Sequence, residues 1–216
     1  ENTLFARWAI NTFWVATAST LLSVFCGVLA AYALARLSFP GNAFISVTIF
    51  VTYLVPPVLL FIPLADVIST LGLLDSQWAL ILSYPTILVP FATWLLMGYF
   101  KTIPKELEEC ARIDGATRFM AFYRIILPLA TPGILSAGIF AFTLSWNEFL
   151  FALVFLSTPD LKTVPVGVTS ELIKGDVFFW GSLMAGALFG SIPIAVVYSF
   201  FVEYYVSGLT GGAVKG

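Results

Sequence analysis

The polar chemistry of this 216-residue chain is concentrated in one stretch, Lys101–Ile134. The chain has 10 basic and 12 acidic side chains, and seven of these charges lie between Glu106 and Arg124. No histidine occurs anywhere in the chain, so this stretch lacks the commonest general acid and base. Its carboxylates and guanidinium groups are instead suited to hydrogen bonds and ion pairs with a partner.

The residue types disfavour catalysis and metal binding. Without histidine, and with Cys26 and Cys110 as the two thiols, the chain lacks the usual ligand sets of zinc and haem. A Ser/His/Asp or Cys/His arrangement is impossible, and no GxxxxGK[ST] motif is present to cradle a nucleotide phosphate. We therefore predict a protein that is not an enzyme, has no metal site and binds no cofactor of its own.

Local signals predict a helix, a turn and a second helix in the polar stretch. Thr102 is placed to cap a first helix whose early turns carry glutamates near the positive end of the helix dipole. Asp114 and Gly115 end this helix, because glycine readily adopts the left-handed conformation. Thr117 is placed to cap the second helix.

The second helix has an apolar side without a core of its own, formed by Ala116, Phe119, Met120 and Tyr123. A soluble partner would cover these side chains. Alternatively, the helix pair lies on lipid headgroups or packs on other helices of the same chain. The pattern by itself leaves both interpretations open.

The rest of the chain is strongly apolar, with 60% hydrophobic residues, 10% charged residues and a mean hydropathy of +0.99. Such a composition predicts an all-α, polytopic membrane protein, here a single domain over residues 1–216. A net charge of −2 argues against nucleic acid as a partner. Each of five apolar runs is near or above the length that spans a bilayer: 8–34, 45–68, 78–100, 125–156 and 182–206.

Prolines lie inside the second, third and fourth of these runs. Pro56, Pro57 and Pro63 lie in the second run, and Pro85 and Pro90 lie in the third, where we expect kinks or local unwinding. The fourth run contains Pro128 and Pro132, so we expect its spanning part to begin near Gly133.

The basic residues predict the orientation of the spans. If the loop of residues 101–124 is cytoplasmic, seven basic residues lie inside and three lie outside. The inside set is Arg36, Lys101, Lys105, Arg112, Arg118, Arg124 and Lys215, and the outside set is Arg7, Lys162 and Lys174. This bias predicts an extracytoplasmic N-terminus and a cytoplasmic C-terminus.

Asn147 and Glu148 are candidate functional residues inside the fourth apolar run. A carboxylate within a span costs about 2.5 to 3.5 kcal/mol on insertion scales, so it should face protein or water. Glu148 and Asn147 would either line a substrate pathway or hydrogen-bond to a helix of a partner subunit.

The polar stretch resembles the EAA loop of ABC importer permeases. Glu109, Cys110 and Ala111 are followed after three residues by Gly115, and Ile125 follows after nine more, with Leu127-Pro128 in place. Asp114, Ala116, Phe122 and residues 132–134 also match. Cys110 stands where the family usually has alanine. The sequences ARLSFPG (35–41), SWNEFLFAL (145–153) and GLTGGAVKG (208–216) are similar to the carbohydrate branch, in particular to maltose- and trehalose-type subunits.

The resemblance implies a permease subunit that forms half of the translocation pathway for a sugar, such as a disaccharide or oligosaccharide, or for a related polyol or glycerophosphodiester. The implied partners are a second homologous permease, a homodimeric ATPase that binds ATP and Mg, and an extracytoplasmic sugar-binding protein, in a bacterial or archaeal plasma or inner membrane. The family normally has six spans, so we expect the first to be missing from this sequence.

The resemblance also assigns roles to residues. Residues 101–134 would be the cytoplasmic coupling loop that docks into the ATPase, with Glu109 as a polar contact, Gly115 as the turn, and Phe119 and Phe122 as apolar anchors. A cytoplasmic tail, residues 207–216, would reach the ATPase dimer through Gly211, Gly212, Val214 and Lys215.

A self-contained secondary transporter driven by an ion gradient is the main alternative, because broken helices suit that class as well. The spans nevertheless lack clusters of acidic or basic residues suited to proton or cation coupling.

Overall fold

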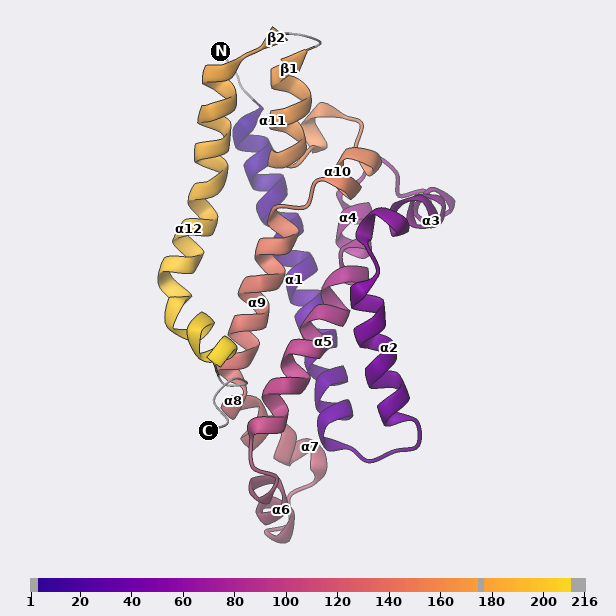
Figure 1. Ribbon diagram of the computed structural model, residues 1–216, viewed down its shortest axis with the longest axis vertical. Coiled ribbons are helices and arrows are strands. Elements are labelled where there is room, and N and C mark those ends of the chain that lie inside the picture. The colour runs from indigo at the N-terminus through magenta and orange to yellow at the C-terminus, as the bar shows by residue number, and fades with distance from the viewer. Residues whose placement is uncertain (1–3, 175–176, 211–216) are drawn as a thin grey trace.

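The computed structural model describes residues 4–174 and 177–210, with side chains described for 4–173 and 179–200 (Figure 1). Over these described ranges the chain is helical apart from loops and one pair of two-residue antiparallel strands. The elements in chain order are α1 (Phe5–Arg36), α2 (Asn42–Leu54), α3 (Pro57–Thr70), α4 (Gln77–Ser83), α5 (Pro85–Thr102), α6 (Glu106–Ile113), α7 (Arg118–Ala121), the π-helix η1 (Phe122–Ile126), α8 (Leu127–Leu129), α9 (Thr131–Trp146), α10 (Leu150–Phe155), the 3₁₀-helix η2 (Pro159–Leu161), α11 (Val164–Leu172), β1 (Ile173–Lys174), β2 (Val177–Phe178) and α12 (Trp180–Thr210).

Helix α1 is the centre of the bundle and packs against both α5 and α9 (Figure 1). Its buried face is a stripe of small residues that includes Ala16, Ser23, Gly27 and Ala31. A Cβ atom added at Gly27 would lie 2.9 Å from the Cβ of Ala92 on α5, so these two helices are in close contact. Small residues suit this position because helices in a membrane associate through close packing rather than through the hydrophobic effect.

Among the described residues, three helical segments are long and apolar enough to cross a membrane: Phe5–Arg36, Gln77–Thr102 and Trp180–Phe200. Two further segments are pairs of helices bent by more than 40°, and the count reaches the expected five if each pair is one span. The all-α, polytopic fold expected from the sequence is therefore confirmed.

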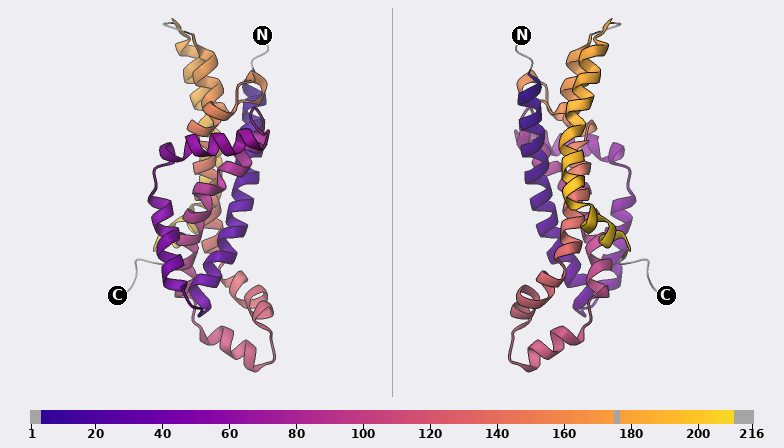
Figure 2. Two further views of the ribbon diagram at one scale, coloured as in Figure 1. Left: turned by 90° about the vertical axis from the view of Figure 1, so that its right-hand side faces the viewer. Right: turned by 90° about the vertical axis from the view of Figure 1, so that its left-hand side faces the viewer.

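The second apolar run differs from a simple span. Helices α2 and α3 meet at an angle of 96° next to Pro56 and Pro57, and α3 runs across the long axis of the molecule (Figure 2). The 13 residues of α2 extend about 20 Å, which is shorter than the roughly 30 Å hydrocarbon core. The expected break at the prolines is confirmed, but a single continuous helix over 45–68 is not formed.

The prolines of the third run have a smaller effect. Helices α4 and α5 are separated by Tyr84, whose φ of −58° and ψ of −36° are still helical. Pro85 takes the first position of α5, where its missing N–H costs no hydrogen bond. Residues 77–102 thus form one candidate span.

The fourth run bends by 70° between residues 118–129 and α9. Helix α9 begins at Thr131, close to the start expected near Gly133, and ends at Trp146. The preceding residues, α6 to α8, form a unit whose far end, α6, projects beyond the ends of α1 and α2 (Figures 1 and 2).

Candidate functional site

The projecting unit begins with α6, an eight-residue helix with Glu106, Glu108 and Glu109 in its first turn. Thr102 does not cap this helix, contrary to the expectation: it is the last residue of α5, and its hydroxyl donates to the carbonyl of Tyr99. The reason is Pro104, which disfavours helical geometry at Ile103, where ψ is 128°. Helix α6 consequently starts only after the proline.

The turn between α6 and α7 has the predicted chemistry. Gly115 adopts a left-handed conformation with φ of 88°. The amide of Ala116 donates to the carbonyl of Ala111 at 2.9 Å, as in a Schellman motif, and satisfies the end of α6. The Thr117 hydroxyl accepts from the amide of Met120 at 3.2 Å, so the predicted cap of the second helix is confirmed.

The surface of the unit combines acidic and apolar side chains. Ile113 and Phe119 are 84% and 74% exposed, and Tyr123 is also exposed. Glu109, Cys110, Asp114 and Ala116 lie in this region, and all but half-buried Ala116 are exposed. For this surface the sequence left open a soluble partner, lipid headgroups or other helices of the chain. In the structure these side chains are not covered by other helices of the described chain, and α6 points away from the bundle (Figure 2).

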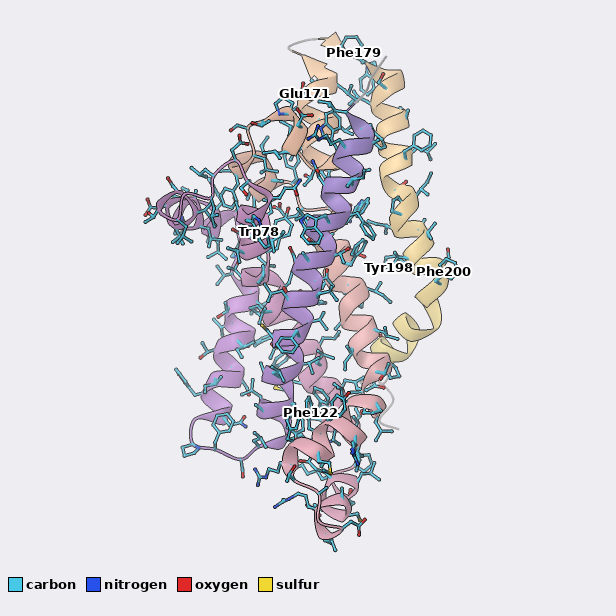
Figure 3. All side chains as sticks on the ribbon, turned by 180° about the vertical axis from the view of Figure 1, so that it is seen from behind. Trp78, Phe122, Glu171, Phe179, Tyr198 and Phe200 are labelled. Atoms are coloured by element: carbon cyan, nitrogen blue, oxygen red, sulfur yellow. The ribbon has the colours of Figure 1, made fainter. Side chains whose placement is uncertain are left out.

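Other predicted residues lie beneath this surface. Phe122 is 7% exposed and packs against Tyr32 of α1, with ring centroids 4.4 Å apart. It lies at the base of the projecting unit (Figure 3). Ala111 is the buried residue of α6, while Leu127 and Pro128 lie in α8, which leads into α9. Phe122, Ala111 and half-buried Leu127 support the unit from within the fold, whereas the side chain of Pro128 is exposed.

The predicted C-terminal tail is mostly outside the described residues. Gly211, Gly212, Val214 and Lys215 belong to the part of the chain that is not described. Residues 207–210 are the end of α12 and are helical.

Asn147 and Glu148 lie in the connection between α9 and α10. The carboxylate oxygens of Glu148 accept from the amides of Phe151, at 2.8 Å, and Ala152, at 3.2 Å. Glu148 therefore stabilises the first turn of α10. Asn147 is exposed, donates to the carbonyl of Thr143, and lines a cavity of about 710 Å³ between α9, α11 and α12.

Two polar residues near the end of α1 bind other segments, and these contacts were not predicted from the sequence. The Tyr32 hydroxyl donates to the carboxylate of Glu108 at 2.7 Å, and Arg36 donates to the carbonyl of Ile103. The available signal was the spacing of Tyr32 and Arg36, four residues apart at the end of an apolar helix. That spacing places both on one face.

A family model described as "Binding-protein-dependent transport system inner membrane component" matches residues 23–211. The chain belongs to this family. Family membership agrees with the resemblance found in the polar stretch, and the comparisons offer no support for a self-contained transporter driven by an ion gradient.

Several curated relatives of this permease cover nearly all of it. It is 44% identical over 207 residues to the sulfoquinovosyl glycerol transport system permease protein SmoH of Agrobacterium fabrum, covering 95% of this chain and 72% of the relative. It is 38% identical to the trehalose transport system permease protein SugB of Mycobacterium tuberculosis, covering 99% and 78%.

Solved structures share the fold of the permease. A bacterial alginate ABC transporter, in complex with an alginate pentasaccharide-bound periplasmic protein, has a chain that superposes with a TM-score of 0.74 at 17% identity, covering 93% of this chain and 78% of that chain. A chain of the MetNI methionine ABC transporter gives a TM-score of 0.67 at 15% identity, covering 96% and 99%.

Proposed function

We propose that this permease forms half of the translocation pathway of an ATP-driven importer for a sugar or a related polar solute, and that α6 and α7 dock into its ATPase. The observation that carries this proposal is the projecting helix–turn–helix unit with its exposed acidic and apolar side chains. The sugar substrate class is supported by relatives named for trehalose and for sulfoquinovosyl glycerol transport.

Individual residues take distinct roles in this proposal. Exposed Glu109 supplies a charge for hydrogen bonding to the ATPase, and Phe119 enters an apolar cleft, since burial of its exposed ring is favourable. Gly115 sets the angle between the two helices. Phe122 fixes the unit to α1 from beneath.

The remaining partners follow from the same proposal. A homologous permease supplies the other half of the pathway, a homodimeric ATPase binds ATP and Mg, and an extracytoplasmic binding protein delivers the sugar. The permease itself performs no catalysis. In this proposal the ATPase dimer also contacts the C-terminal tail, residues 207–216.

The distribution of basic residues supports a cytoplasmic location for α6 and an extracytoplasmic start of α1. Arg36 and the basic residues of 101–124 lie at the α6 end of the molecule. Arg7 and Lys162 lie toward the opposite end, where each pairs with a carboxylate, Asp160 at 3.1 Å and Glu171 at 2.7 Å. An unequal distribution of this kind follows the positive-inside rule.

The proposal is tested with the reconstituted complex of both permeases, the ATPase and the binding protein. We expect ATP-dependent uptake and ATPase stimulation by the sugar-loaded binding protein. Glu109→Lys should reduce the amount of ATPase that co-purifies, because it reverses a charge on the docking surface. The matched control is Asp66→Lys, a charge reversal at an exposed position of α3, which should leave co-purification unchanged.

Uptake that is driven by an ion gradient without any ATPase would contradict the proposal. Equal co-purification with Glu109→Lys and Asp66→Lys would contradict the role of Glu109.

A further inference from the structure

One side-chain hydrogen bond links α6 directly to a spanning helix. The Tyr32 hydroxyl of α1 donates to Oε1 of Glu108 at 2.7 Å. Helix α6 otherwise packs on α7 and η1, and Ala111 is its buried residue. Within the described part of the chain, no other α6 side chain hydrogen-bonds to a spanning helix. The bond is strong for its kind because its acceptor is ionised.

Glu108 differs from the other acids of α6 in its surroundings. Glu106 and Glu109 are exposed, whereas Glu108 is half-buried and faces the bundle. Both acids line a small polar pocket with Arg36 at the end of α1. The carboxylate of Glu108 accepts the hydrogen bond from α1, whereas the side chain of Glu109 is exposed.

Tyr32 lies where four elements meet. Its ring is buried and packs against Phe122 of η1, at 4.4 Å between centroids, and against Phe100 of α5, at 6.2 Å. Its hydroxyl reaches Glu108 of α6. The aromatic contacts fix the ring, so the position of the hydroxyl follows the position of α1.

The opposite end of α1 forms hydrogen bonds with the segment that leads into α11, residues 159–164. Trp8 Nε1 donates to the carbonyl of Pro159 at 2.8 Å, and the Asn11 amide donates to the carbonyls of Asp160 and Lys162. The Thr12 hydroxyl accepts from the amide of Val164 at 2.8 Å.

No proline interrupts the 32 residues of α1, which extend about 48 Å. Two other segments of the bundle are bent, residues 118–146 by 70° and residues 42–70 by 96°, whereas residues 77–102, which pack against α1, form one candidate span. Helix α1 is thus an unbroken connection between the segment at 159–164 and α6.

We infer that Tyr32 is a positioning residue that couples α6 to α1, so that a displacement of α6 by the ATPase moves α1 and the segment held at its other end. This inference rests on the proposed function. Glu108, and not Glu109, is the α6 residue that transmits the movement to α1. Docking to the ATPase and transmission of the movement therefore depend on different residues.

The test compares variants in the full reconstituted complex. Tyr32→Phe removes only the hydroxyl. This variant should reduce both the stimulation of the ATPase by the loaded binding protein and the uptake of substrate by about tenfold. A factor of this size is expected from the loss of one hydrogen bond to a charged group. The basal ATPase rate and the amount of co-purified ATPase should stay unchanged, because the docking surface is intact.

Two variants of Glu108 complete the test. Glu108→Ala should reproduce the loss without altering the buried core, and Glu108→Gln should retain most of the stimulation because its amide oxygen still accepts from Tyr32. Combining Tyr32→Phe with Glu108→Ala should give no further loss, as expected for partners in one interaction. The matched control is Tyr53→Phe on α2, which should behave as wild type.

Three results would overturn the inference: Tyr32→Phe behaves like Tyr53→Phe, the losses of Tyr32→Phe and Glu108→Ala multiply, or co-purified ATPase falls in proportion to stimulation. Each presupposes a wild-type complex with ATP-driven uptake. A wild-type complex without such uptake would instead contradict the proposed function.

Discussion

Asp75 shows how a single residue joins two loops in the half of the molecule away from α6. Its Oδ1 accepts from the amides of Ser157 and Thr158, both at 2.9 Å, and its Oδ2 accepts from the Thr158 hydroxyl. Its own amide donates to the carbonyl of Phe155 at 2.8 Å. The Thr158 hydroxyl, followed by the two amides, holds the pKa of Asp75 below its usual value of 3.8.

This lowered pKa predicts a loss of the loop contact in acid. A carboxyl with a depressed folded-state pKa stabilises the fold above its unfolded pKa, and the stabilisation disappears as the pH falls through the folded value. We expect amide exchange at Ser157 and Thr158 to be faster in Asp75→Asn than in wild type at about pH 5, and this ratio to approach one at pH values below about 4. A ratio that does not vary with pH would contradict the ionised contact.

We predict that Glu148 stabilises the fold at the start of α10 and does not bind the substrate. Glu148→Ala removes the acceptor for two amides at the start of α10 and should destabilise the protein by about 1 to 2 kcal/mol, measured by thermal unfolding in detergent. Glu148→Gln keeps one acceptor and should lose less. A raised KM for uptake with unchanged stability would show instead that Glu148 lines the substrate pathway.

At the scale of elements, the turn between α6 and α7 depends on the left-handed conformation of Gly115. A Cβ at this position would have open space around it, so Gly115→Ala acts through backbone strain alone, at about 1 kcal/mol. The strain should shift the helix pair from its docking geometry and lower the ATPase affinity about fivefold in a titration of the permease pair with ATPase.

Gly98→Ala is the matched control for this prediction. Gly98 lies within α5 and also has open space around it, but its backbone is helical. This variant should bind the ATPase as wild type does. Equal affinities for the two variants would contradict a role for the turn geometry.

At the scale of the whole molecule, α6 and the α1 N-terminus lie at opposite ends (Figure 1). The chain supplies a natural probe, because Cys110 on α6 is exposed and Cys26 can be replaced by serine. In this background, a membrane-impermeant maleimide should label Cys110 in inverted vesicles but not in intact cells, and bound ATPase should protect it.

The control for orientation is a cysteine at Ser157, an exposed residue toward the other end of the molecule. With both native cysteines replaced, Ser157→Cys should be labelled in intact cells. Labelling of Cys110 from outside the cell would reverse the proposed orientation.

Features with local causes were predictable from the sequence. Gly115 and Thr117 end and begin helices through their own backbone and hydroxyl groups, so the α6–turn–α7 unit was predicted correctly. Apolar length is likewise a local property, and it identified the spanning segments. The prediction for Thr102 was wrong even at short range, because Pro104 lies between the threonine and the helix.

Features that depend on distant contacts were decided by the tertiary structure. Prolines 56 and 57 predicted a break, but not that α3 turns by 96° and packs on α10. Tyr32 and Glu108 are 76 residues apart, and nothing local distinguishes Glu108 from Glu109. The α6–turn–α7 surface was predictable from the sequence, because the residues that start and end its helices are close together in the chain. Only the folded chain decided which acid faces α1, because that choice depends on how two distant helices are brought together.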